Sequence, residues 1–234
     1  MVFPIRINRY LALKGYATRR QADELIEKKC VKINDRLAIV GDIVQEKDVV
    51  SVTINRAQKK QYSYFLYFKP RGIITHSPQG EEKEIADILK LKQRVFPVGR
   101  LDKDSRGLIV LTDDGRIVER LLSPSRFHEK EYQVKVNKPL TAHFIKNLAQ
   151  GVQIEDYRTK PAKVTQIGPQ EFRIVLTEGK KHQIRRMASS FGYTTSDIFR
   201  TRIMNLVIGK LKAGDFREIT GLELENFLKS LGLK

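Results

Sequence analysis

A single stretch, VFPVGRLDKDSRGLIVLTDDG, constrains the fold of this chain more than any other part of its sequence. Its apolar residues predict one strand at residues 95–98 and a second at residues 107–112, with a charged loop between them. Asp102 lies in this loop. A polar loop that joins two strands is held at both ends by a sheet, and such loops commonly carry functional groups. We therefore expect Asp102 to lie on a rigid loop.

The residues around Asp102 do not by themselves give it a role. Arg100 and Lys103 lie close to it in the sequence, and neighbouring cations favour the ionised form of a carboxylate. An ionised carboxylate suits a nucleophile or a general base. A turn aspartate that only hydrogen-bonds its own backbone fits the same spacing. Local context leaves both interpretations open.

A family resemblance decides between these interpretations. The string GRLDKDSRGLIVLTDDG resembles the motif of the RsuA-type RNA pseudouridine synthases, in which the Asp of G-R-L-D is catalytic. The resemblance implies that Asp102 is the catalytic aspartate and that Arg100 helps to bind the flipped nucleotide. The pieces VFPVGRLDKDS, HEKEY and RTRIMN are most similar to the RluF branch, which acts on large-subunit rRNA; Gln93 replaces a lysine of that branch.

The charge of the chain predicts a polyanionic partner. The 44 Lys and Arg residues outnumber the 27 Asp and Glu residues, which gives a net charge of +17. Residues 1–62 carry 13 basic and 7 acidic groups, and residues 63–234 carry 31 and 20. Both parts are positive, so nucleic acid is the expected partner, and a basic tail alone is not expected to bind it.

Several classes of site are not expected. One cysteine, Cys30, cannot form an internal disulfide, and four scattered histidines give no metal-ligand spacing, so we expect neither a metal nor a cofactor. No apolar run approaches the ~20 residues of a membrane span. The first nine residues contain no signal-peptide core. The sequence therefore predicts a cytoplasmic protein without a membrane partner, and a monomer.

Residues 1–54 are predicted to form a small separate domain. A helix is expected at residues 6–13 with Gly15 ending it, and Thr18 is a suitable N-cap for a second helix. Residues 31–33, 37–40 and 49–54 are expected as short strands, with a tight turn at Asn34 and Asp35. Residues 55–63 are polar and are expected to be a linker to a catalytic domain at residues 64–234.

The segment ATRRQADELIEKKCVKIN resembles the S4 RNA-binding domain, a module of two helices and a short sheet that presents a basic face to structured RNA. Charge alone favours a solvated helix face, and the S4 resemblance reverses that preference. The resemblance implies that phosphates are bound by the basic residues of this module, which are Arg6, Arg19, Arg20, Lys28 and Lys29.

Two further motifs occur in the expected catalytic domain. The strand at residues 64–68 is followed by Lys69-Pro-Arg-Gly, which resembles the first family motif, and we expect Lys69 near the substrate. In the strand at residues 130–136, periodicity alone predicts that Tyr132 is a core aromatic residue. The family resemblance of HEKEY implies more: that Tyr132 lies against the target uracil and is a candidate for the proton transfer from C5.

The segment EGKKHQIRRMASSF has the apolar spacing of a helix and resembles the third family motif. The resemblance implies that Arg185 forms an ion pair with the catalytic Asp102 and that Ile184 packs on the uracil. His182 is expected to be structural or to contact RNA. Near the end of the chain, Arg202 matches a final family motif and is expected to bind substrate.

Taken together, long alternating strands with few helices between them predict an α+β fold with a mainly antiparallel mixed sheet flanked by helices. The family resemblance implies isomerisation of a specific uridine in rRNA, with 23S rRNA as the preferred target. The alternatives are 16S rRNA or tRNA as the target, or a non-catalytic S4-type protein that binds RNA in ribosome assembly. A glycoside-type hydrolase using Asp102 and Asp104 fits less well, because carboxylates two residues apart on a turn have no fixed separation.

Overall fold

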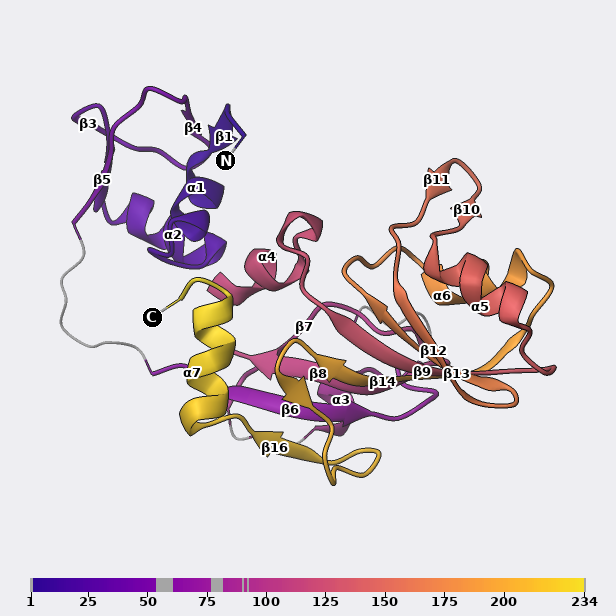
Figure 1. Ribbon diagram of the computed structural model, residues 1–234. Helices are drawn as coiled ribbons and strands as arrows, with labels where there is room; N and C mark the ends of the chain where they lie inside the picture. Colours follow the sequence, from indigo (N-terminus) through magenta and orange to yellow (C-terminus); the bar gives the residue numbers. More distant parts are fainter. Residues whose placement is uncertain (1, 54–60, 77–81, 90, 92, 234) are drawn as a thin grey trace.

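The protein is described by a computed structural model over residues 2–53, 61–76, 82–89, 91 and 93–233. A small amino-terminal module lies beside a second part, which is built on a long sheet and carries the remaining helices (Figure 1). Residues 55–60 of the predicted linker lie outside the described residues. The module contains β1 (Ile5–Arg6), α1 (Ile7–Leu13), α2 (Arg19–Glu27), β2 (Val31–Ile33), β3 (Arg36–Leu37), β4 (Ile43–Val44) and β5 (Val50–Val52).

The amino-terminal module forms as its sequence predicts. The Thr18 side chain accepts a hydrogen bond from the Gln21 backbone, and the Gln21 side chain accepts one from the Thr18 backbone, so that a capping box begins α2. Asn34 and Asp35 adopt positive φ angles of 49° and 67° in the predicted turn, a conformation that these residues tolerate well. The two predicted helices are confirmed, while the strands at residues 37–40 and 49–54 are shorter than expected.

The second part of the chain is built on a nine-stranded sheet in the order β12-β13-β9-β14-β8-β6-β16, with β7 paired to β8 and β15 paired to β14. The pair β14 and β8 is parallel, and the other pairs of this sheet are antiparallel. The predicted mainly antiparallel mixed sheet is therefore confirmed. Its strands are β6 (Tyr64–Lys69), β7 (Phe96–Val98), β8 (Arg106–Thr112), β9 (Lys130–Val136), β12 (Lys163–Gly168), β13 (Glu171–Leu176), β14 (Thr195–Ile203), β15 (Leu206–Val207) and β16 (Phe216–Glu218).

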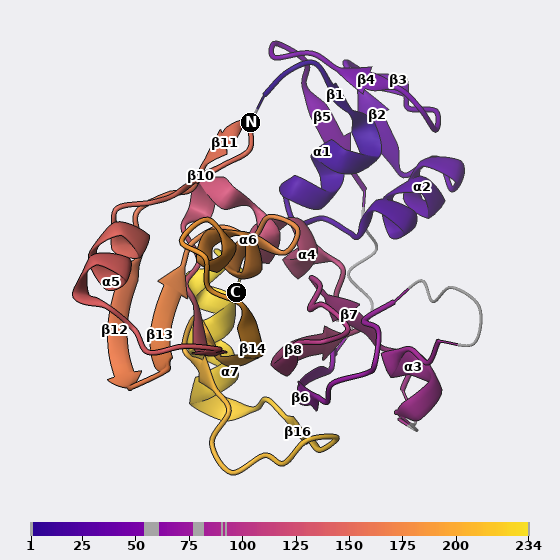
Figure 2. The ribbon, with the colours of Figure 1, turned by 90° about the vertical axis from the view of Figure 1, so that its right-hand side faces the viewer.

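Helices cover both faces of the sheet at β6 and β8 (Figures 1 and 2). Alternate residues of β6 enter different cores: Phe65 joins a core with residues of α3, α5 and α6, and Leu66 joins one with residues of α4 and α7. This explains why every residue of β6 is buried. The elements outside the sheet are α3 (Ile85–Ile88), α4 (Arg116–Leu122), a 3-10 turn (Pro124–Arg126), α5 (Ala142–Ala149), the hairpin β10 (Gln153–Ile154) and β11 (Tyr157–Arg158), α6 (Gln183–Ser189) and α7 (Gly221–Ser230).

A glycine allows β8 to approach β14. Gly107 has a φ of +118°, and a Cβ atom on it would lie 2.3 Å from the carbonyl oxygen of Arg200. A side chain would therefore clash with the backbone of β14, in a conformation that residues other than glycine rarely adopt. The parallel pairing of Gly107 with Arg200 joins the two halves of the sheet.

The amino-terminal module rests on α4 and on the end of the chain. The Arg120 guanidinium donates from Nη2 to the Leu13 carbonyl of α1 (2.9 Å) and from Nη1 to the Leu231 carbonyl (2.9 Å). Arg9 of α1 forms an ion pair of 2.9 Å with Glu119 of α4. One arginine thus joins three elements that are far apart in the sequence.

The first turns of α5 and α7 are capped differently. Helix α5 begins at Ala142, and Thr141 caps it by accepting a hydrogen bond from the Phe144 backbone. Thr220 precedes α7 but makes no side-chain cap. Glu223, three residues after Thr220, accepts two hydrogen bonds, of 2.6 and 2.7 Å, from Arg217. A charged guanidinium on the neighbouring β16 is a stronger partner than a backbone N–H. None of the helices in the described residues is both long and apolar enough to span a membrane.

Candidate active site

The loop that carries Asp102 is held by hydrogen bonds to its backbone. The Thr75 hydroxyl accepts from the Leu101 N–H (3.0 Å) and donates to the Leu101 carbonyl (2.8 Å). The Lys103 carbonyl accepts from the Gly72 N–H (2.9 Å), and the Ser105 N–H donates to the Asp102 carbonyl (3.0 Å). These bonds fix the backbone on both sides of Asp102 while its side chain stays 38% exposed. The rigid loop that the sequence predicted is confirmed.

Lys69 supports this loop from inside the protein. Its side chain is fully buried, and its ammonium donates to the carbonyls of Pro70 (2.9 Å), Ile73 (2.7 Å) and Lys103 (3.4 Å). Burial, and then the charge of Arg200, lower the pKa of Lys69 to about 8. The expectation that Lys69 contacts substrate is therefore corrected, because an enclosed ammonium positions the Asp102 loop instead.

A cavity of about 550 Å³ opens beside Asp102. It lies where the two cores of the sheet meet, since Leu121 and Ile203 belong to one core and Tyr132 and Ile184 to the other. The volume is within the range of small-molecule sites and can accept one nucleotide. Its wall includes groups from the Asp102 loop, from α4, from β9 and β14, and from the segment that leads into α6.

Three residues that the sequence singled out join Asp102 in this cavity. Tyr132 of β9 and Ile184 of α6 are 8% and 6% exposed, and both line the cavity. Arg100 lines the cavity from the exposed side of the Asp102 loop. An aromatic ring and an aliphatic side chain near a carboxylate provide the apolar surfaces that a flat base needs.

Arg185 lies elsewhere than the family resemblance implied. Its Nη1 donates to the Thr195 hydroxyl (3.0 Å), and its Nη2 donates to the Asp104 carbonyl (3.3 Å). It therefore supports the loop through the backbone and not through the Asp102 carboxylate. Among the described residues, the ion-pair neighbour of that carboxylate is His182, with its Nε2 atom at 3.7 Å from Oδ1.

A bulge in β14 separates two arginines that the sequence does not distinguish. Arg200 pairs with Tyr132 across the strands, but Arg202 pairs with Glu131, so β14 advances two residues while β9 advances one. Arg200 consequently lines the cavity. Arg202 bonds Glu129 (2.9 Å) and the Met204 carbonyl (2.8 Å), and it is not among the residues that line the cavity. The expected substrate contact of Arg202 is therefore corrected, and Arg200 occupies that place.

Lys130 is a second cation of the cavity that the sequence reasoning missed. It begins β9 two residues before Tyr132, so the two side chains lie on the same face of the sheet. Burial, and then the charge of Arg200, lower the pKa of Lys130 to about 8. Its place in the HEKEY segment, in phase with Tyr132, was a signal that could have identified it.

Glu178 anchors the segment that leads into α6. It is 4% exposed, and its carboxylate accepts from Gln183 Nε2 (2.7 Å), from the Lys160 N–H (3.1 Å) and from the Tyr157 hydroxyl. The hydrogen bond to Glu178 raises the pKa of Tyr157 to about 12. These contacts tie the β10–β11 hairpin to the wall of the cavity.

The basic residues that the sequence singled out in the amino-terminal module are exposed, in contrast to the buried Arg200 of the cavity. The solvent-exposed set comprises Arg6, Arg19, Arg20, Lys28 and Lys29. Within the described part of the chain, no group of three or more His, Cys, Asp or Glu side chains is arranged to bind a metal ion.

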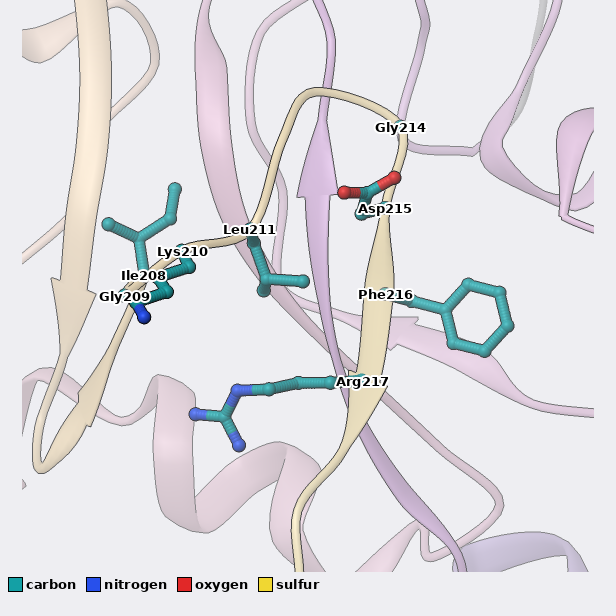
Figure 3. Close-up of a pocket in the computed structure, with 8 residues that line it drawn as sticks. All are labelled: Ile208, Gly209, Lys210, Leu211, Gly214, Asp215, Phe216 and Arg217. Carbon is teal, nitrogen blue, oxygen red and sulfur yellow. The ribbon is translucent and has the colours of Figure 1, made fainter.

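Another cavity, of about 450 Å³, lies in the loop between β15 and β16 (Figure 3). Two of its charged groups already have intramolecular partners: Asp215 accepts from the Lys212 N–H (3.0 Å), and Arg217 is paired with Glu223. None of the residues that line it belongs to the Asp102 loop. The cavity at Asp102 is therefore the candidate active site.

Comparisons with known proteins identify the family to which this chain is similar. Residues 63–190 match the family model described as RNA pseudouridylate synthase, and residues 5–50 match the S4 domain. The chain is 41% identical over 228 residues to the dual-specificity RNA pseudouridine synthase RluF of Escherichia coli K12, which covers 96% of this chain and 79% of that protein. It is 31% identical to the ribosomal large subunit pseudouridine synthase B of Bacillus subtilis, with 94% of each chain covered. A crystal structure of a pseudouridylate synthase aligns with a TM-score of 0.70 and 26% identity over 97% of this chain and 99% of the other.

Proposed function

Because this chain belongs to the RNA pseudouridine synthase family and carries an S4 domain, we propose that it isomerises a uridine of large-subunit rRNA with Asp102 as the catalytic residue. The observation that carries the proposal is the placement of Asp102 on a fixed loop at the mouth of a nucleotide-sized cavity. Large-subunit rRNA is proposed because the Bacillus subtilis relative is named for that subunit and the motifs resemble the RluF branch.

The target uridine must leave its base stack to reach Asp102. Extrusion of a base costs a few kcal/mol, which contacts to the RNA backbone have to offset. The net charge of +17 and the exposed cations of the S4 domain support such contacts. We assign phosphate binding to Arg19 and Arg20 first, because both lie in the first turn of α2 and are exposed. The S4 domain is proposed as residues 1–54 and the catalytic domain as residues 64–234.

In the proposed reaction the N1–C1′ bond breaks, the uracil turns within the cavity, and a C5–C1′ bond forms. Asp102 acts on the ribose or assists the cleavage of this bond. Tyr132 and Ile184 contact the two faces of the uracil, and Tyr132 is the candidate for moving the proton from C5. Arg100 binds the sugar-phosphate at the cavity mouth. Arg185 and Lys69 act as positioning residues, since both donate to carbonyls of the Asp102 loop.

A second RNA substrate has one observation in its favour. The Escherichia coli relative is named as a dual-specificity enzyme. We therefore propose that tRNA be tested beside rRNA. The enzyme is proposed to act as a cytoplasmic monomer.

The test uses RNA labelled with tritium at C5 of uridine, because replacement of the C5 hydrogen by the sugar releases the label. The wild-type protein is expected to release tritium from unmodified large-subunit rRNA, and Asp102→Asn is expected to release none. Asp104→Asn is the matched control, since Asp104 is an exposed carboxylate on the same turn; it should retain activity. Equal release by the wild type and Asp102→Asn would reject Asp102 as the catalytic residue. Absence of release in both variants would favour a mechanism with two carboxylates.

A further inference from the structure

The Arg200 guanidinium is buried in the cavity wall with one nitrogen left without a partner. Arg200 is 4% exposed; its Nε donates to the Leu108 carbonyl (2.6 Å) and its Nη1 to the Arg100 carbonyl (3.4 Å). Its Nη2 is buried and has no acceptor among the described residues. A buried, charged donor without an acceptor is costly, so it marks a place where an acceptor belongs. Because Arg200 lines the cavity, that acceptor can come from a bound nucleotide.

Lys130 provides a second donor beside Arg200. Lys130 and Tyr132 lie on one face of β9, and Arg200 is the cross-strand partner of Tyr132, so the three side chains are neighbours on that face. The Lys130 ammonium donates to the His128 carbonyl at 3.4 Å. Neither Lys130 nor Arg200 forms an ion pair with a carboxylate among the described residues. Two partly desolvated cations thus share one wall without a protein anion to neutralise them.

The carboxylates that also line the cavity are engaged elsewhere. Glu178 accepts from Tyr157, Lys160 and Gln183, and Asp102 lies beside His182. The negative charge that Lys130 and Arg200 would stabilise must therefore come from the substrate. The depth of Arg200, beside the 8% exposed Tyr132, favours the base of a flipped nucleotide over its phosphate. An RNA backbone follows the protein surface, and the base enters the pocket.

We propose that Lys130 and Arg200 bind the carbonyl oxygens of the flipped uracil and stabilise the negative charge that develops on it when the glycosidic bond breaks. This inference rests on the proposed isomerisation of uridine. It assigns the two cations a part in the chemical step, distinct from the phosphate contacts of the S4 domain.

The negative charge on the uracil follows from the breaking of the N1–C1′ bond and the forming of the C5–C1′ bond. Cleavage of N1–C1′ leaves its electron pair on the uracil, which becomes an anion with charge on N1, O2 and O4, while Asp102 compensates the electron-poor sugar. When C5 bonds to C1′, the π pair of C5=C6 forms the new bond and the N1 pair replaces it as N1=C6. Loss of the C5 proton to solvent restores C5=C6, and N1 takes up a proton, so that the isomerisation balances. Fixed cations beside O2 or O4 stabilise the anion more than the neutral base, and this difference accelerates the reaction.

The test distinguishes an effect on the rate of the chemical step from an effect on RNA binding. Single-turnover rate constants for pseudouridine formation and RNA dissociation constants are measured for the wild type, Lys130→Met and Arg200→Lys. Each substitution is expected to lower the rate constant about 10²–10³-fold, the typical effect of removing one donor to a developing oxyanion. RNA affinity is expected to change by less than about twofold. Lys130→Arg, which retains the cation, should recover most of the rate that Lys130→Met loses.

Lys135→Met is the matched control for Lys130→Met. Lys135 lies on the same strand, is exposed, and pairs with Glu171 at 3.4 Å. It should keep the wild-type rate. Thermal unfolding of each variant identifies loss of fold; should Arg200→Lys unfold because it no longer bonds Leu108 and Arg100, the Lys130 series still decides the proposal.

A change of leaving group gives a result that a structural role would not produce. Fluorine at C5 withdraws electrons and stabilises the uracil anion, so stabilisation of that anion by Lys130 and Arg200 should matter less for the rate. With 5-fluorouridine at the target site, the defect of Lys130→Met is expected to shrink at least about tenfold, measured as consumption of that nucleoside after RNA digestion. An equal defect with both bases would overturn the proposal.

An RNA with an abasic target nucleotide distinguishes the base from the phosphate. If the cations bind uracil, the wild type and Lys130→Met bind this RNA equally well. Weaker binding by Lys130→Met would assign Lys130 to a phosphate and overturn the inference. Wild-type turnover is the internal reference: if the wild type itself makes no pseudouridine, it is the proposed function that fails, whereas an active wild type with equally active variants rejects only this inference.

Discussion

The exposed basic residues of the S4 domain and the buried basic residues in and beneath the cavity are of the same types but lie in opposite environments. Arg19 and Arg20 are exposed on α2. Arg200 is 4% exposed and Lys69 is fully buried. Exposed cations bind phosphates in a salt-dependent and sequence-independent way, whereas buried ones act at one position and are screened little by salt. Under the proposed function, the exposed cations would bind the RNA backbone and the buried cations would act on one nucleotide.

The largest effect is expected from a substitution that disturbs the buried region alone. Gly107→Ala would place a Cβ atom 2.3 Å from the Arg200 carbonyl, at a φ of +118°. Backbone strain and overpacking each cost about 1–3 kcal/mol, so the free energy of unfolding should fall by about 2–6 kcal/mol. Urea unfolding measures this change, and turnover should be abolished because Arg200 and the Asp102 loop are displaced.

Gly214→Ala provides the control for that prediction. Gly214 also has a positive φ, of +92°, but nothing lies within 4 Å of the position where a Cβ atom would be. The cost should be limited to backbone strain. Equal destabilisation by the two substitutions would show that the close approach of β8 to β14 is not what requires Gly107.

Raising the pH should affect stability and catalysis in opposite directions. Burial first, and Arg200 second, lower the pKa values of Lys69 and Lys130 to about 8, while an unfolded lysine has a pKa of about 10.4. Between these values the unfolded chain binds more protons, so the contribution of these lysines to the free energy of unfolding rises from about pH 8 upward. The single-turnover rate should fall over the same range, because Lys130 loses its charge.

Lys130→Arg tests the origin of that fall in rate. Arginine stays charged at pH 9, so the variant should keep its rate there. Arg200, Asp102, Glu178, Lys180 and His182 line the cavity with Lys130, and Lys69 lies under the loop. If the rate of Lys130→Arg still fell above pH 8, one of those groups would be responsible, and the assignment to Lys130 would be wrong.

A smaller effect, confined to binding, is expected in the S4 domain. Arg19→Ala combined with Arg20→Ala should reduce the slope of log affinity against log salt by about 0.7–0.9 for each phosphate that is no longer neutralised. The single-turnover rate at saturating protein should not change. Arg200→Lys should show the reverse pattern, with an unchanged salt slope and a slower reaction. A salt slope that stays the same in the double variant would show that these arginines do not bind phosphate.

The smallest effect is expected where the two regions touch. The ion pair of Arg9 with Glu119 is exposed, at 52% and 38% of the two side chains. Exposed ion pairs contribute little, because water and salt screen them. A double-mutant cycle with Arg9→Ala and Glu119→Ala should show coupling close to zero in thermal unfolding. A large coupling would mean that this pair, and not Arg120, holds the S4 domain against α4.

Local sequence predicted much of the fold and part of the site. The spacing of apolar residues predicted β8 and β9 close to where they form, and Thr18 was correctly predicted to cap α2. The residues on both sides of Asp102 correctly predicted a loop between two strands. These features depend on neighbours within a few residues. Sequence reasoning failed where a residue's environment depends on distant segments, as with the burial of Lys69 and the hydrogen bonds of Arg185.

The sequence by itself determined the family and the basic character of the chain, and it singled out Asp102 for the proposal, because motifs and charge can be read along the chain. Only the tertiary structure decided which cations enter the cavity. Strict alternation along β14 would place Arg200 and Arg202 on one face, but the bulge between them turns Arg202 toward Glu129 and Glu131 and leaves Arg200 beside Tyr132. The register between β14 and β9 sets that bulge, and it arises only when these two strands, which are far apart in the sequence, pair with each other.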